Sequence, residues 1–198
     1  YQEMGPDDCA RIVESIVAVD PPGRDAAEIA AELAAEESDR QEAEVLATLG
    51  TGRSLRDHLM SESLLIRTDF SDDVAWRDTA VAAMAPVPQG DDTEFAAYLT
   101  CIDNRENDGM TVDGLLDAIG EPPPYYAFLV DAETMSNPEK PIICVYTGPD
   151  EPERPRGRTF RVVPSEMSSV ENNLSIANMD FEDFANSADD DGVFRGFR

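Results

Sequence analysis

The apolar positions in the later two thirds of the chain fall into short runs, separated by longer amphipathic stretches. The runs are rich in β-branched, aromatic and aliphatic residues, and each is followed by aspartate, proline or a glycine-containing turn. This pattern is typical of strands in a folded sheet. Five runs predict strands, at residues 64–68, 95–102, 126–130, 142–146 and 159–163.

A spacing of three and four residues between apolar positions predicts helices after several of these strands. Ser71 is placed to cap a helix over residues 72–84, and Thr111 and Ser165 are placed to cap two more. The last of these has one apolar face, formed by Met167, Val170, Leu174 and Ala177.

This order of elements predicts an α/β fold. Strand and helix alternate through the first three strands, and two further strands and helices follow. We expect a mixed, three-layer sheet of about five strands with flanking helices, over residues 61–198. Residues 1–60 read as a separate helical extension.

The helical extension begins with a narrow apolar stripe, and Asp25 with Glu28 is placed to form a reciprocal cap on a second helix after it. Two interpretations stay open: the extension docks on the α/β domain, or it is an arm whose apolar stripe binds a partner. In the second case, the partner-binding residues are Ile12, Val13, Ile16 and Val17.

Several specific strings also support a family resemblance. They are LLIRTDFSDD, FLVDAETMSNPEKPIICV, VPSEMSSVENNLSIANMDFEDFA and DDDGVFRGF. With these strings, residues 63–197 resemble an uncharacterised bacterial domain family. The family has no assigned activity, so the resemblance implies no functional residues, and it does not cover the chain before Ser61.

The net charge of the chain indicates which classes of molecule it can bind. With 42 acidic against 15 basic residues, the formal net charge is -27. Such a charge repels nucleic acid and anionic membranes and favours basic proteins or metal cations, although it is also typical of a solubility surface. The three cysteines have no paired spacing, and no apolar run approaches the roughly 20 residues that span a bilayer. We therefore expect a cytoplasmic protein.

Three predicted strands are each followed by an aspartate: Asp69, Asp103 and Asp131. If the strands are parallel, the three carboxylates gather at one edge of the sheet, where open α/β sheets bind ligands. Carboxylate oxygens suit Mg²⁺, which could position a phosphoryl group. Aspartate is also an ordinary turn and helix-start residue, so a purely structural role stays open.

The only concentration of basic residues lies between Arg154 and Arg161. These arginines are either balanced by the protein's own acids or available to an anionic ligand or partner, in which case Arg156 and Arg158 are the candidates. Zinc is excluded, because His58 is the only histidine and the cysteines are scattered.

The sequence supports two classes of function. The first is a non-enzymatic acidic module without a cofactor that binds another protein with a basic surface, as an adaptor or subunit or as an immunity-like inhibitor. The alternative is a Mg²⁺-dependent phosphoryl-transfer or hydrolytic enzyme that uses the strand-end aspartates.

Overall fold

The computed structural model of the chain describes residues 25–49, 52–57, 62–88, 93–119, 123–152 and 154–198. The predicted apolar stripe, Ile12, Val13, Ile16 and Val17, lies outside these residues, as do Cys9 and His58.

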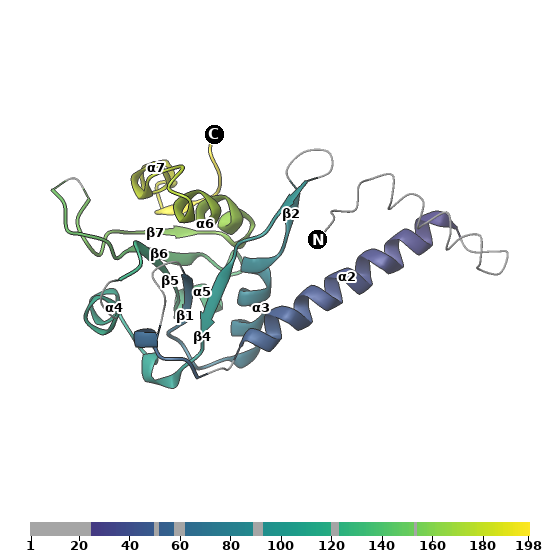
Figure 1. Cartoon of the computed structure of the whole chain (residues 1–198), viewed down its shortest axis with the longest axis horizontal. Coiled ribbons are helices and arrows are strands. Elements are labelled where there is room, and N and C mark those ends of the chain that lie inside the picture. Colours follow the sequence, from purple (N-terminus) through teal and green to yellow (C-terminus); the bar gives the residue numbers. More distant parts are fainter. Residues whose placement is uncertain (1–24, 50–51, 58–61, 89–92, 120–122, 153) are drawn as a thin grey trace.

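A mixed sheet of six strands forms the centre of the molecule, in the order β4-β1-β5-β6-β7-β8 (Figure 1). Strand β1 is parallel to both of its neighbours, β6 is antiparallel to both of its own, and β7 and β8 are parallel. The sheet has one strand more than the five predicted, because a short strand near the carboxyl terminus joins its edge. The strands are β1 (Ser63–Arg67), β4 (Leu99–Ile102), β5 (Tyr126–Val130), β6 (Ile142–Tyr146), β7 (Thr159–Val162) and β8 (Val193–Phe194).

Helices cover both faces of this sheet, so the predicted three-layer α/β architecture is confirmed (Figure 1). Side chains alternate along β1: Leu65 belongs to the core on one face, and Leu64 and Ile66 to the core on the other. The first face carries α3 (Asp73–Met84), α5 (Ala132–Ser136), η3 (Pro164–Glu166), α6 (Met167–Ser175) and α7 (Phe181–Ser187). The second face carries α4 (Val112–Ala118) and the short turn η1 (Leu55–Asp57).

The helix α2 (Ala26–Thr48) precedes the sheet and runs away from it at its amino-terminal end (Figure 1). The part of Asp25 in the predicted cap is confirmed, since its carboxylate accepts a hydrogen bond from the backbone N–H of Ala27 at 3.3 Å. Near its other end, Val45 and Leu49 pack against the core, and the helix contacts α3. The described helix of the extension is therefore docked at its carboxyl-terminal end.

Two predicted helix caps are wrong. Asp72, not Ser71, caps α3, because its carboxylate accepts from the backbone N–H groups of Val74 and Ala75. Ser165 lies inside the 3₁₀ turn η3, and α6 begins after it without a side-chain cap. Pro164 fits this turn, since proline needs no backbone hydrogen at the start of a helical segment.

One predicted strand is divided in the structure. Only the second half of 95–102 joins the main sheet, as β4, while β3 (Glu94–Phe95) pairs with β2 (Val87–Pro88) in a separate antiparallel ribbon. The reason lies in the residues between them: the backbone O of Ala96 and the backbone N–H of Tyr98 bond to side chains of α6 instead of a neighbouring strand.

The two described cysteines, Cys101 and Cys144, are buried, and neither of them forms a disulfide. Burial raises the pKa of the Cys144 thiol. Over the described residues, none of the helices combines the length and the apolar character that a membrane span requires.

Candidate functional site

The carboxyl ends of β1 and β4 form a crevice of the kind that binds ligands in α/β proteins. These strands are neighbours in the sheet, but β1 leads to α3 on one face and β4 leads to α4 on the other. Where two adjacent strands send their connections to opposite faces, a crevice opens between the two loops. The predicted parallel order of the three aspartate-terminated strands is confirmed by the pairing of β1 with β4 and β5.

Arg67, the last residue of β1, lies at the centre of this crevice. It is buried, and its Nη2 donates to the carboxylate of Asp73 at 2.7 Å, while Nη1 lies 3.4 Å from Asp103. Its Nε donates to the backbone O of Asp69 at 2.9 Å. The guanidinium also lies over the ring of Phe70, 4.3 Å from its centroid. Arg67 lowers the pKa of Asp73 through its hydrogen bond and its charge.

The three strand-end aspartates have separate partners within the protein. The carboxylate of Asp69 accepts from the backbone N–H of Ser71 at 2.8 Å, and that of Asp103 faces Arg67. Asp131 caps α5 and forms a two-pronged ion pair with Arg161, at 2.7 and 3.1 Å. Within the described ranges, no group of three or more histidine, cysteine or acidic side chains is close enough together to hold a metal ion.

The ion pair with Arg161 changes the acidity of Asp131. Burial by itself would raise the pKa of this carboxyl group, but hydrogen bonds from Arg161 and Thr134 outweigh it and lower the pKa below the ordinary value. Asp131 is therefore ionised and held in place at neutral pH. Its role in the structure is to join the start of α5 to β7.

The crevice encloses a cavity of about 290 Å³, and α2 forms part of its wall. Arg67, Asp73 and Asp103 line it together with Trp76, and the end of α2 contributes Leu46 and Leu49. The indole Nε1 of Trp76 is buried without a hydrogen-bond partner. The sequence contained a signal for the role of Arg67, because it is a charged residue at the end of an otherwise apolar predicted strand.

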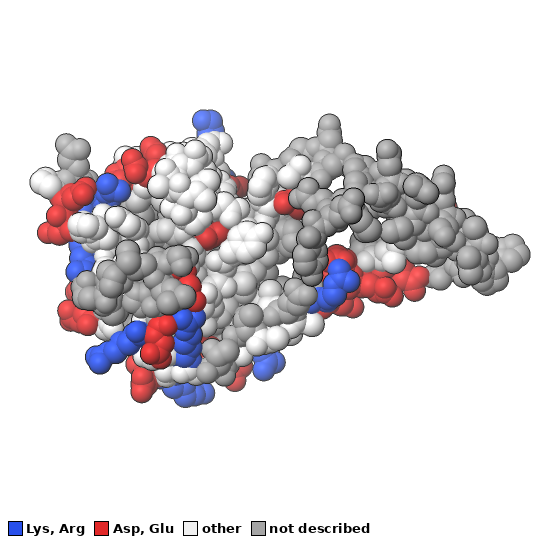
Figure 2. All heavy atoms as spheres, in the orientation of Figure 1, with Lys and Arg blue, Asp and Glu red and all other residues white. Residues whose placement is uncertain are grey.

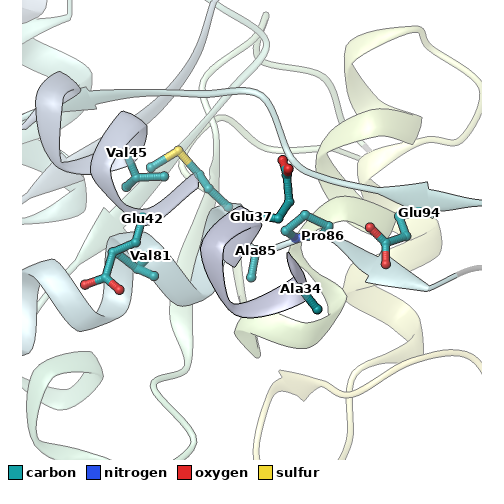
Figure 3. A pocket seen from close by; sticks show the side chains of 9 residues that line it. Ala34, Glu37, Glu42, Val45, Val81, Ala85, Pro86 and Glu94 are labelled. Carbon is teal, nitrogen blue, oxygen red and sulfur yellow. The ribbon is translucent and has the colours of Figure 1, made fainter. Parts of the chain in front are cut away.

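A second hollow, which we call the acidic groove, lies between α2, α3 and the β2–β3 ribbon (Figure 3). It has a volume of about 350 Å³. Its glutamates are Glu37 and Glu42 of α2 and Glu94 of β3, and Figure 3 shows apolar side chains between them. The apolar residues are Ala34, Val45, Val81, Met84, Ala85 and Pro86.

Among the described residues, one of the three glutamates of the acidic groove has an ion-pair partner. Glu37 forms an ion pair with Arg40 on the same helix. Glu42 and Glu94 form no ion pair with any residue that the structure describes. Figure 2 shows further acidic side chains along the described part of α2. The groove therefore combines apolar area with negative charge that the described basic residues only partly pair.

The arginines before β7 face the protein's own acids. Arg154 lies within 4.0 Å of the carboxylates of Glu151, Asp180 and Glu182. Arg158 donates to the side-chain O of Asn186 at 2.7 Å. The Nε of Arg156 is buried without a hydrogen-bond partner. A partner-binding role for Arg156 and Arg158 stays a prediction.

The fold and the crevice define the class of this protein: a mixed α/β domain with a charged crevice at the carboxyl edge of its parallel strands. Residues 62–197 match the model of a domain of unknown function, DUF6924, and the chain belongs to that family. This confirms the resemblance seen in the sequence, while a bacterial origin stays a prediction. The chain matches no curated protein and no solved structure.

Proposed function

We propose that this chain is a non-enzymatic protein-binding module that holds a basic partner in the acidic groove. The observation that carries the proposal is the composition of the groove, which three glutamates line together with six apolar residues. Lysine and arginine side chains suit such a surface, because their apolar stems can cover the apolar residues while their charged ends reach the carboxylates.

The net charge of -27 supports the same assignment. A strongly acidic protein attracts a basic partner over a distance and raises the rate of encounter more than the final affinity. An adaptor or subunit role and an immunity-like inhibition of a basic partner are both consistent with this surface. We place the protein in the cytoplasm, because Cys101 and Cys144 are buried and neither of them forms a disulfide.

A pair of charge-matched variants tests this proposal. Glu42→Gln with Glu94→Gln neutralises the groove, while Asp113→Asn with Asp117→Asn removes the same charge from exposed positions on α4. The probe is a synthetic amphipathic helix with arginine along one face, titrated by calorimetry at low salt. We expect the groove variant to bind about tenfold more weakly and the α4 variant to bind almost as the parent does. An equal loss in both variants would mean that the peptide senses only the net charge.

A second candidate is a Mg²⁺-dependent phosphoryl-transfer or hydrolytic enzyme. The observation that favours it is the position of Asp69 and Asp103 beside the crevice between β1 and β4. A site-bound ion would raise the midpoint of thermal unfolding in millimolar Mg²⁺. Asp69→Asn should abolish that rise, and Asp117→Asn should not. A rise that survives Asp69→Asn reports only screening of the surface charge.

A further inference from the structure

An aromatic pocket lies at the amino end of β5 and the carboxyl end of β6, at the opposite end of the strands from the crevice. Its volume is about 420 Å³. The rings of Tyr125, Tyr126, Tyr146 and Phe181 line it, together with Leu174 and Met179. It shares no residue with the acidic groove, so a ligand in this pocket does not depend on the proposed function. A hollow of this size with apolar walls and few polar groups is typical of a site for a small ligand or a side chain.

The hydroxyl of Tyr126 belongs to a hydrogen-bond chain whose direction can be worked out. Ser63 Oγ donates to the buried carboxylate of Glu171 at 2.7 Å, and the hydroxyl of Tyr126 is 2.7 Å from the same Oγ. A serine hydroxyl has a single hydrogen, so Tyr126 must be the donor to Ser63. Ser175, whose hydroxyl also lies near this phenol, donates its own hydrogen to the backbone O of Asn172 at 3.0 Å, so the phenolic oxygen of Tyr126 keeps acceptor capacity.

This arrangement also keeps Tyr126 in its protonated form. Burial raises the pKa of the Tyr126 phenol, and the nearby charge of Glu171 raises it further. The phenol therefore carries its proton at neutral pH and can donate it to Ser63. A ligand group that reaches this hydroxyl meets an acceptor, which favours an N–H or O–H donor on the ligand.

The charged side chains at the rim of the pocket determine whether a positive or a negative ligand is favoured. Arg154 lies over the ring of Tyr146, 5.0 Å from its centroid, and already faces Glu151, Asp180 and Glu182. The Nε of Arg154 has no hydrogen-bond partner, but three carboxylates lie within 4.0 Å of its guanidinium, so negative charge outweighs positive charge at this rim and disfavours a ligand anion. A ligand cation finds Asp180, whose side chain is 77% exposed and only loosely paired with Arg154, at 3.8 Å.

We propose that this pocket binds an aromatic ring that carries a hydrogen-bond donor, with a positive charge attached beyond the ring. The ring stacks among the tyrosines and Phe181, its donor reaches Tyr126, and the charge lies toward Asp180. Two sources share this chemistry: a free aromatic amine, and a tryptophan or tyrosine next to a basic residue in a peptide.

Three small molecules test the proposal by calorimetry on the full chain. Tryptamine has the ring, the donor and the positive charge; 3-indolepropionate reverses the charge; phenethylamine lacks the ring donor. We expect tryptamine to bind at least about tenfold more tightly than either of the others. Equal binding of tryptamine and 3-indolepropionate, or the absence of tryptamine binding at millimolar concentration, would overturn the proposal.

Single substitutions test whether Tyr126 and Asp180 make the two proposed contacts with the ligand. Tyr126→Phe should bring the affinity of tryptamine down to that of phenethylamine, and Asp180→Asn should weaken tryptamine about two- to fivefold without changing the affinity of neutral indole. Tyr98→Phe, at a tyrosine that is 80% exposed and does not line the pocket, should change neither. An unchanged affinity for tryptamine in both Tyr126→Phe and Asp180→Asn would place the binding elsewhere.

A last comparison separates the two sources. Acetyl-Trp-Lys-amide and tryptamine present the same ring, donor and charge, but only the first has a peptide backbone on both sides. Tighter binding of the dipeptide identifies a peptide as the ligand, and tighter binding of tryptamine identifies a free amine. Weaker binding of both than of acetyl-Trp-Glu-amide would contradict the inferred preference for positive charge.

Discussion

At the scale of single residues, arginines form ion pairs with the acidic residues that follow the strands of this domain. Arg67 fixes the loops at the ends of β1 and β4, and Arg161 joins Asp131 to the neighbouring part of the sheet. The sequence places the aspartates correctly after parallel strands. It does not reveal their partners, because Asp131 and Arg161 are 30 residues apart and periodicity does not say which side chains meet across a sheet.

Asp131 makes stability depend on pH in a defined direction. Its pKa is lower in the folded protein than the ordinary value of 3.8, so its ion pair stabilises the fold above that pH. The stabilisation is lost as the pH falls from about 4 through the lower pKa of the folded state. We expect Asp131→Asn, which keeps a helix-capping side chain, to cost about 1 to 2 kcal/mol at pH 7.

The measurement is urea unfolding of the parent and Asp131→Asn at pH 7 and at pH 3. The difference between the two proteins should shrink at the lower pH. A difference that is equal at both pH values would show that the charge of Asp131 is not what stabilises the fold.

At the scale of elements, the strands of the sheet are better specified by the sequence than the segments between them. The predicted boundaries of β5 and β6 agree with the structure, because each is a continuous buried run with a clear end. The short helix α5 was missed, since five residues are too few to show a helical period. The division of 95–102 could not be foreseen either, because it depends on contacts with α6, more than 70 residues later.

The docking of α2 is a testable property of this element. Leu49 packs against the core at the carboxyl-terminal end of the helix, whereas Leu33, nearer the other end, is 38% exposed. We expect Leu49→Ala to lower the free energy of unfolding by about 1 to 2 kcal/mol, as for a partly buried leucine. The matched substitution Leu33→Ala should cost less than about 0.5 kcal/mol. Urea unfolding measures both, and equal costs would mean that α2 is held along its whole length.

At the scale of the whole molecule, the dominant property is the net charge of -27. The described arginines are used mostly inside the protein, in ion pairs at the crevice, before β7 and at the carboxyl terminus. The uncompensated acids are therefore left to face solvent and partners. The composition predicts the net charge of the chain, but it does not predict where on the surface the charge lies. Where the charge gathers depends on which acids the fold brings next to an arginine.

Self-repulsion at this net charge predicts that salt stabilises the fold. Raising NaCl from about 0.02 to 0.5 M shortens the Debye length from more than 20 Å to less than 5 Å, which weakens repulsion between distant surface acids. We expect the midpoint of thermal unfolding to rise by several degrees, measured by circular dichroism. KCl should give the same rise, because screening does not distinguish the two cations. A fall in the midpoint would show that the ion pairs contribute more to stability than the repulsion removes.

The helix α2 contributes side chains to two hollows of the surface, the acidic groove and the crevice beside Arg67. One segment of this helix forms a wall of the acidic groove, through Glu37 and Glu42, and a later one closes the crevice, through Leu46 and Leu49. A helix of 23 residues is a stiff rod about 35 Å long. If a bound protein tilts or slides this rod, it changes the opening beside Arg67 in the same movement. Glu42 and Leu46 are one helical turn apart, so the two hollows share this helix as a common wall.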